Sequence, residues 1–162
     1  MKTGNLAISD LSNHEPHINV GGDELTLRVT SDQSDGAILA FDVRIPAGGG
    51  PPLLHRHGAF EIYRVERGEL AFYLEDKHGD VQRAVVQSGA VVAIPGGREH
   101  TVRNESADEA RAFVMFAPGS EMECFVRAAG ELGADGAPEI EDVLALADAH
   151  RVTITRPLSR VA

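Results

Sequence analysis

Apolar and polar residues alternate along most of the chain with a period of two, which is typical of β-strands. Turn-forming residues divide this pattern into short segments, as in an all-β sandwich or barrel. The expected strands lie at 24–30, 37–45, 60–66, 69–75, 81–87, 90–94, 101–104 and 111–117. A glycine- and proline-rich loop at 46–52 and a hairpin turn at 77–80 interrupt the series. The sequence therefore predicts a small antiparallel β-barrel of jelly-roll type.

The apolar spacing becomes helical after about residue 118. Ser120 is expected to cap the first helix and to form a capping box with Glu123. Gly130 or Gly133 would end this helix, because glycine is favoured just after a helix C-terminus. The residues spaced to form its apolar face are Met122, Phe125, Val126 and Ala129.

A second helix is expected after Pro138, because proline is favoured in the first helical turn. Its apolar stripe consists of Ile140, Val143, Leu144 and Ala147. Residues 151–155 are expected to add a short strand. The chain is thus divided into a polar, irregular N-terminal arm at 1–22, a β-barrel at 23–118, and a helical extension at 119–162 that packs on the barrel.

Two separate segments carry the candidate chemistry. The first places His55, His57 and Glu61 at odd positions of a strand-like stretch, so their side chains would share one face. The second puts His100 on another strand, after a Pro-Gly-Gly turn. Three imidazoles and a carboxylate on one concave surface would bind a metal and leave a coordination position open. This ligand set suits divalent iron, nickel, manganese, cobalt, copper or zinc, and the lack of thiolate argues against a closed structural zinc site.

These two segments resemble the two motifs of the cupin family. The first motif is a glycine, five residues, His-x-His, three or four residues, Glu, six residues and Gly. The second is a glycine, five residues, Pro-x-Gly, two residues, His, three residues and Asn. The matching positions are Gly49, His55, His57, Glu61 and Gly68 for the first motif, and Gly89, Pro95, Gly97, His100 and Asn104 for the second. The resemblance implies the cupin double-stranded β-helix, a jelly-roll barrel that here carries two C-terminal helices, and association into a homodimer.

The individual residues also allow simpler interpretations. A lone histidine is more often structural than a metal ligand, and even the full set is compatible with a vacant site. Candidate substrate contacts are Tyr63, Phe72, Ile94, Val102 and Phe116, which would line a mostly apolar pocket. For the tyrosine, packing in the core is the alternative. The turn residues just before the last histidine, Arg98 and Glu99, are interpreted as a solvated turn.

Charge and composition narrow the possible partners. The formal net charge of −10, without a basic patch, argues against binding to nucleic acid or to an anionic membrane. No apolar run approaches the ~20 residues of a membrane span, and the first ten residues lack the apolar core of a signal peptide. The single cysteine, Cys124, forms no internal disulfide and agrees with a reducing compartment. We therefore expect a cytoplasmic protein whose partner is a small molecule.

Residues 116–154 resemble, more loosely, the tail of quercetin-dioxygenase-like cupins. That resemblance implies a dioxygenase with a small enolic or phenolic, flavonol-like substrate, with dioxygen as the second substrate. Glu61 would be both a metal ligand and the catalytic proton acceptor. One alternative is a non-oxidative isomerase, lyase or decarboxylase in which the metal acts as a Lewis acid. Another is a binding module for small molecules without turnover.

Overall fold

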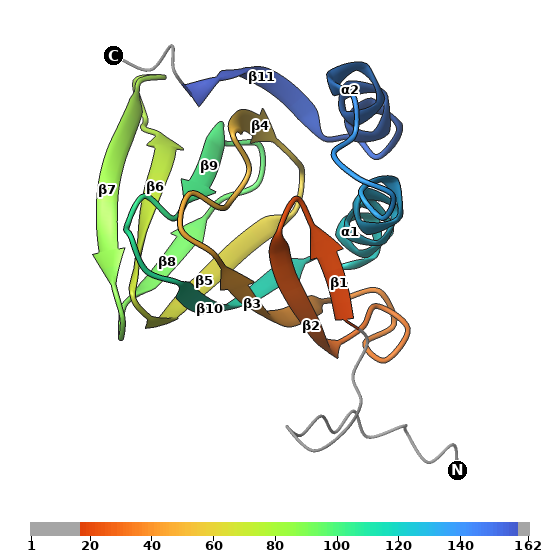
Figure 1. The fold of residues 1–162 in the computed structure, drawn as a ribbon, viewed down its shortest axis with the longest axis horizontal. Coiled ribbons are helices and arrows are strands. Elements are labelled where there is room, and N and C mark those ends of the chain that lie inside the picture. Colours follow the sequence, from red (N-terminus) through yellow and green to blue (C-terminus); the bar gives the residue numbers. More distant parts are fainter. Residues whose placement is uncertain (1–16, 159–162) are drawn as a thin grey trace.

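Two antiparallel sheets face each other across the core of this computed structural model, which describes residues 17–158 (Figure 1). The six-stranded sheet has the order β1 (His17–Val20), β2 (Asp23–Val29), β3 (Leu39–Ile45), β10 (Ala110–Ala117), β5 (Phe60–Arg67), β8 (Val91–Ile94). The five-stranded sheet has the order β11 (Thr153–Pro157), β4 (Leu53–Arg56), β9 (His100–Arg103), β6 (Glu69–Glu75), β7 (Val81–Gln87). The predicted all-β jelly-roll barrel is confirmed, and the eight expected strands are found within one or two residues of their predicted bounds.

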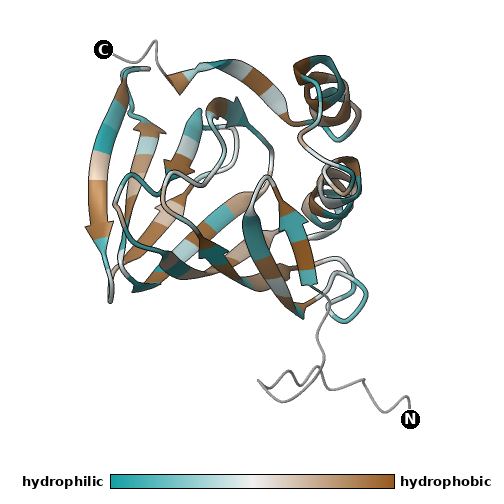
Figure 2. Ribbon diagram, in the orientation of Figure 1, coloured by the Kyte–Doolittle hydropathy of each residue, from teal (hydrophilic) through white to brown (hydrophobic). Residues whose placement is uncertain are grey.

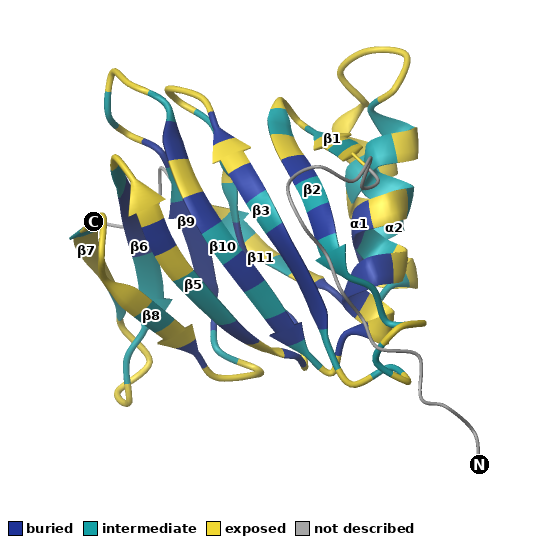
Figure 3. Cartoon of the chain, turned by 90° about the horizontal axis from the view of Figure 1, so that it is seen from below, coloured by how far each residue is buried: buried dark blue, intermediate teal, exposed yellow. Residues whose placement is uncertain are grey.

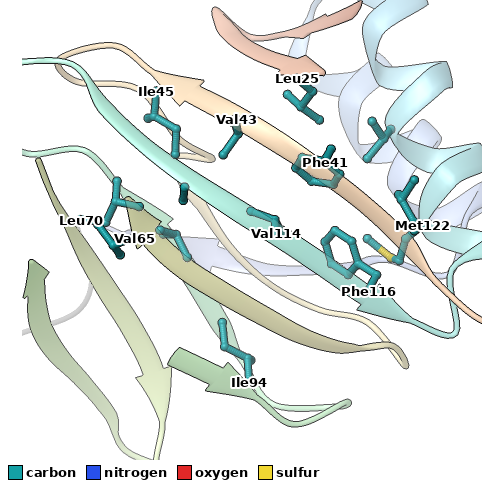
Figure 4. Packing of buried hydrophobic residues seen from close by; sticks show 14 of the residues in the cluster. Leu25, Phe41, Val43, Ile45, Val65, Leu70, Ile94, Val114, Phe116 and Met122 are labelled. Atoms are coloured by element: carbon teal, nitrogen blue, oxygen red, sulfur yellow. The ribbon is translucent and has the colours of Figure 1, made fainter. Parts of the chain in front are cut away.

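Alternating apolar side chains of both sheets form the core, and the alternation is visible along the strands (Figure 2). Leu27, Val65, Leu70 and Val114 are fully buried, and they come from both sheets. Figure 4 shows this packing, with Phe116 and Phe41 on the side of the core where Met122 lies. The rings of this pair lie 6.0 Å apart and are tilted by 35°. The barrel is thus filled by side chains at this end.

Two strands were not among those that the sequence predicts. The arm at 1–22 is expected to be irregular, but His17–Val20 forms β1 and pairs with β2; residues 1–16, which include His14, lie outside the described part. The four-residue strand is too short for its alternation to stand out. The other strand, β4, is equally short and follows the loop at 46–52 directly; it lies in the stretch around His55 that is expected to be strand-like, but it ends at Arg56 and does not continue to Glu61. The division of the chain at 22/23 and 118/119 stays a prediction.

The first helix, α1 (Ser120–Leu132), begins differently from the prediction. Its N-cap is Gly119, and no side chain caps it, so the capping box of Ser120 and Glu123 is wrong. A Cβ atom on Gly119 would lie 2.1 Å from the carbonyl carbon of Ile38, so only glycine allows this close approach. The buried Glu123 carboxylate instead accepts a hydrogen bond from the backbone N–H of Ser31, at 2.6 Å.

The helix ends agree better with the sequence. Gly133 is the C-cap of α1, as predicted, whereas Gly130 lies inside the helix against Ile18 of β1. The second helix, α2 (Ile140–Ala149), begins two residues after Pro138. Its predicted apolar stripe is only partly buried, because Ile140 and Leu144 are 55% and 42% exposed. This helix packs mainly on α1 and β11, so it has no sheet to cover its whole apolar face.

The helices close one side of the barrel. In Figures 1 and 3 they stand beside β1 and β2, and β7 lies on the opposite side of the molecule. Strand β11 extends the five-stranded sheet next to β4, with Ile154 opposite His55. The two strands at the other ends of the sheets, β7 and β8, have no further strand beside them in the described residues.

Candidate metal centre

The structure brings the four candidate ligands together at one end of the barrel. The ligand nitrogens of His55, His57 and His100 all lie within 4.8 Å of one another. One carboxylate oxygen of Glu61, Oε2, lies 3.1 Å from Nε2 of His100 and 3.3 Å from Nε2 of His57. All but His55 are buried, and His55 is half-buried. The cluster thus has the compactness that a single metal ion requires.

The ligands come from both sheets. Their odd residue numbers instead predict that His55, His57 and Glu61 share one face of a single strand-like stretch. Strand β4 ends at Arg56, the chain turns, and Glu61 then lies on β5 in the other sheet, opposite Ile94 of β8. His55 and His100 face each other on β4 and β9. The turn is tight because Gly96 packs on it: a Cβ atom there would lie 2.2 Å from the carbonyl oxygen of Gly58.

Backbone carbonyl groups fix the orientation of all three imidazoles. Nδ1 of His55 lies 3.0 Å from the carbonyl oxygen of Leu53. Nδ1 of His57 lies 3.0 Å from that of Ala59, and Nδ1 of His100 lies 2.8 Å from that of Arg98. In the neutral tautomer that these contacts favour, Nδ1 donates its proton and Nε2 keeps its lone pair. Such carbonyl partners orient the histidine ligands of protein metal sites.

This donor set fits a divalent metal ion. With Nδ1 facing the backbone, the Nε2 atoms of His57 and His100 face Oε2 of Glu61. In the metal-free cluster a proton between nitrogen and oxygen makes such a contact a hydrogen bond, and a metal ion bound by both atoms would take the place of that proton. His55, His57, His100 and Glu61 would therefore hold the ion, and the mixed nitrogen and oxygen ligands suit a transition metal.

The pKa values show the same electrostatic balance in the metal-free cluster. Burial, together with the charge of His100, lowers the pKa of His55 to about 4. Burial also works against the charged form of His100, but its hydrogen bond to Glu61 raises the net pKa. Burial alone would raise the pKa of Glu61, but its hydrogen bonds with His100 and His57 hold it well below the usual range. The carboxylate is therefore charged and available as a ligand.

The comparisons with known proteins place this geometry in a family. The sequence profile described as "Cupin domain" matches residues 41–116, which contain all four candidate ligands. The chain therefore contains a cupin domain at these residues. No curated protein matches the sequence of this cupin. Within residues 17–158, no helix is long and apolar enough to cross a membrane.

Solved structures show the same fold. The protein TT1209 from Thermus thermophilus is 24% identical, covers 70% of this chain and 99% of its own, and gives a TM-score of 0.55. An RmlC-like cupin from Shewanella frigidimarina is 15% identical over 73% of this chain and 99% of its own, with a TM-score of 0.56. A predicted oxalate decarboxylase from Thermotoga maritima is 19% identical over 69% and 98%, with a TM-score of 0.55. At these identities the likeness concerns the fold alone.

The turn before His100 is more than a solvated turn in this cupin. Glu99 is buried, and its carboxylate accepts a hydrogen bond from Arg156 of β11 at 2.9 Å. Its backbone N–H donates to Glu75, which also pairs with Arg56. This network joins β11, β4 and β6 around the segment that presents His100. No local sequence pattern indicates it, because the partners lie far apart in the chain.

The final asparagine of the second motif has a structural role. Asn104 is fully buried, and its amide nitrogen donates to the carbonyl oxygens of Ile45 and Asp108. Its side-chain oxygen accepts hydrogen bonds from the backbone and the hydroxyl of Ser106. Its backbone also pairs with the glycines at 48 and 49. Asn104 therefore holds the loop at 46–52 against β9, at the end of the barrel away from the metal cluster.

A half-buried carboxyl group, that of Asp23, lies beside the same loop. Oδ1 of Asp23 accepts a hydrogen bond from the backbone N–H of Gly50 at 3.1 Å. Burial raises the pKa of Asp23 from 3.8 to about 6, although Gly50 and the charge of Arg103 act in the opposite direction. The folded protein therefore binds this proton more tightly than the unfolded chain does. Stability from this group is fully present below about pH 4 and is lost as the pH rises through about 6.

We expect the Asp23→Asn variant to lack this component of the pH dependence. Relative to the wild type, the variant should gain on the order of 2 kcal/mol between about pH 4 and about pH 7.5, because the amide keeps an acceptor for Gly50 without a charge. Urea unfolding of both proteins at these pH values measures the difference. An equal change with pH in both proteins would show that Asp23 titrates normally.

The predicted substrate contacts surround the cluster. Phe116 and Ile94 are opposite Glu61 on the neighbouring strands, and both are buried. The ring of Phe116 lies 5.5 Å from that of His57. One row further into the barrel, Tyr63 meets Phe72 edge-to-face at 5.2 Å, and Val102 lies beside Phe72. Burial and the nearby Glu61 raise the pKa of Tyr63 well above its usual value. Contact between a substrate and these five residues stays a prediction.

The other histidines and the cysteine lie away from the cluster. His17 contacts the hydroxyl of Thr26, His78 is exposed in a turn, and His150 follows α2. Cys124 is an exposed thiol on α1. Among the described residues, the three histidines around Glu61 form the one group of potential metal ligands with this compactness.

Proposed function

We propose that this cupin is a metal-dependent dioxygenase that acts on a small enolic or phenolic, flavonol-like substrate, with dioxygen as the second substrate. The observation that carries the proposal is the convergence of three oriented imidazoles and one carboxylate at a single point. Such a set holds one divalent transition metal (iron, nickel, manganese, cobalt, copper or zinc) and leaves positions open for a ligand. Association into a homodimer stays an expectation from the family resemblance.

The charges around the cluster favour a substrate that has no anionic group besides the one that would bind the metal. A small di-acid would require a cationic side chain to neutralise it. In the described residues, the arginines on neighbouring elements are engaged elsewhere: Arg56 with Glu75, Arg98 with the carbonyl oxygen of Asp76, and Arg156 with Glu99. The side chains beside the cluster are aromatic or aliphatic. These surroundings favour an aromatic enol or phenol over the acid substrates of a decarboxylase.

The residues of the cluster would divide the chemical work. A bound metal ion supplies a Lewis acid that makes an enolic or phenolic hydroxyl more acidic. The three imidazoles keep their geometry through the backbone carbonyls. Glu61 would be a ligand and also accept the hydroxyl proton, since its Oε2 is at the centre of the cluster. The pKa of Glu61 is low in the metal-free protein. Glu61 would therefore accept this proton only when a bound metal ion changes the charges around it.

Oxygen consumption tests the proposal. The protein is loaded separately with each candidate metal and screened against flavonols and other enolic phenols. With at least one metal, we expect oxygen uptake that matches the loss of substrate absorbance. Glu61→Gln should lower the rate by about a hundredfold or more, because general-base catalysis contributes at least that factor. The control is Glu66→Gln on the exposed end of the same strand, which should retain the wild-type rate. Substrate turnover without oxygen uptake would contradict a dioxygenase.

A further inference from the structure

Strand β7 is exposed on both of its faces, which is unusual for a strand in a two-layer barrel. Four consecutive residues, 82–85, are exposed. Because successive side chains point to opposite faces, two of them point outward and two point toward the interior. The inner face of β7 is therefore exposed at residues 82 and 84, whereas Val86 on the same face packs against the core.

The register shows which side chains of β7 point inward. Gln82 lies opposite Leu74 of β6, and Leu74 lies opposite His100 of β9. Ala84 lies opposite Phe72 in the next row. Gln82 and Ala84 thus share the face that carries the metal cluster. With about 4.8 Å between neighbouring strands, β7 runs roughly 10 Å from the strand of His100.

Several side chains on the other sides of the cluster are buried, although His55 itself is half-buried. The buried ones are Ile94 and Phe116, which lie opposite Glu61, and Leu39, which lies opposite Phe116. The helices stand on the side away from β7 (Figures 1 and 3), and β11 is the other edge strand of the five-stranded sheet. Toward β7 and β8, in contrast, Leu74, Tyr63 and Val92 are only half-buried. Solvent contact with the inner surface of the barrel thus increases from the cluster toward β7.

We propose that the substrate reaches the metal cluster across the inner face of β7, and that Ala84 is a specificity-determining residue that admits a flat aromatic ring. The inference rests on the proposed function for its substrate class. Ala84 has a small, exposed side chain opposite Phe72, whose ring forms an edge-to-face pair with that of Tyr63. Val92 of β8 faces the same row from the opposite sheet. Gln82 supplies the polar rim, where its amide nitrogen donates to Asp76 at 3.2 Å.

A pair of adjacent substitutions tests this route. Ala84→Phe places a ring on the inner face of β7, and Val85→Phe places the same ring on the outer face as the matched control. Wild type and variants are loaded with cobalt(II), and their metal content is measured first. Two probes are then titrated by visible absorbance: 4-nitrocatechol, a flat phenolic chelator, and azide, which is too small to need a wide path.

The proposal predicts selective loss of the large probe. Ala84→Phe should bind 4-nitrocatechol at least tenfold more weakly than wild type and Val85→Phe, while all three proteins bind azide within about twofold. Gln82→Phe, on the same inner face, should show the same selectivity and serves if Ala84→Phe does not fold. Equal binding of 4-nitrocatechol by the inner-face variants and wild type would overturn the access route and leave the proposed function intact. A metal-loaded wild type that does not bind 4-nitrocatechol at all would overturn both.

Discussion

The His57→Ala variant should contain no stoichiometric metal. His57 is buried, its Nδ1 is fixed by the carbonyl oxygen of Ala59, and its Nε2 faces Glu61 at 3.3 Å. Removing it takes away one of four ligands and leaves a cavity that water would have to fill. Elemental mass spectrometry on protein purified without an affinity tag should find about one metal ion per wild-type chain and at least tenfold less in the variant.

The matched control is His78→Ala, which removes an imidazole from an exposed turn and should keep the wild-type metal content. A double variant, His55→Ala/His100→Ala, should lose the metal as completely as His57→Ala does. Full metal content in either of the cluster variants would refute the assignment of these ligands. If the wild type takes up no metal even after reconstitution, the cluster is a vacant site and the dioxygenase proposal fails with it.

The Asn104→Ala variant should be destabilised by about 2–4 kcal/mol. The substitution removes two donated hydrogen bonds, and it leaves the carbonyl oxygen of Ile45 without this partner in a buried position and that of Asp108 in a partly buried one. An unsatisfied buried polar group lowers stability by about 1–3 kcal/mol. Urea unfolding monitored by circular dichroism measures the change. Because Asn104 lies away from the cluster, the folded variant should still bind one metal ion per chain.

The control for this variant is Asn19→Ala, which removes an exposed asparagine that accepts one hydrogen bond from Gly22 in a turn. It should lower the unfolding free energy by less than about 1 kcal/mol. Equal effects of the two substitutions would show that the buried network of Asn104 contributes little. Loss of metal from folded Asn104→Ala would instead connect this residue to the metal cluster.

Local patterns are sufficient for most of the fold. The alternation of apolar residues predicts β6 and β7 at their observed bounds, because these strands are long enough to show a period. Strands of four residues, such as β1 and β4, give too few alternations to be recognised. The capping box fails for a tertiary reason: Gly119 has to pack on the backbone at Ile38, and Glu123 finds a partner in Ser31.

The candidate site is likewise predicted by the sequence in some respects and not in others. The motif spacing identifies the residues of the cluster. The odd residue numbers of His55, His57 and Glu61 do not explain why these side chains lie together, because Glu61 belongs to the opposite sheet. The partnership of Glu99 with Arg156 depends on the placement of β11, which no local pattern shows. The exposed inner face of β7 is equally invisible in the sequence, because it depends on how far the other sheet extends.

The pairing of β11 with β4 also has a consequence for the order of folding. Thr155 donates a hydrogen bond to the carbonyl oxygen of Leu54, so two segments 101 positions apart meet beside the histidines. During synthesis, the ribosome releases every candidate ligand well before β11 is available to complete the sheet next to His55. Such long-range pairing makes folding slow relative to proteins with local contacts. The nascent chain therefore presents its histidines and Glu61 to cellular metals before the five-stranded sheet beside His55 is finished.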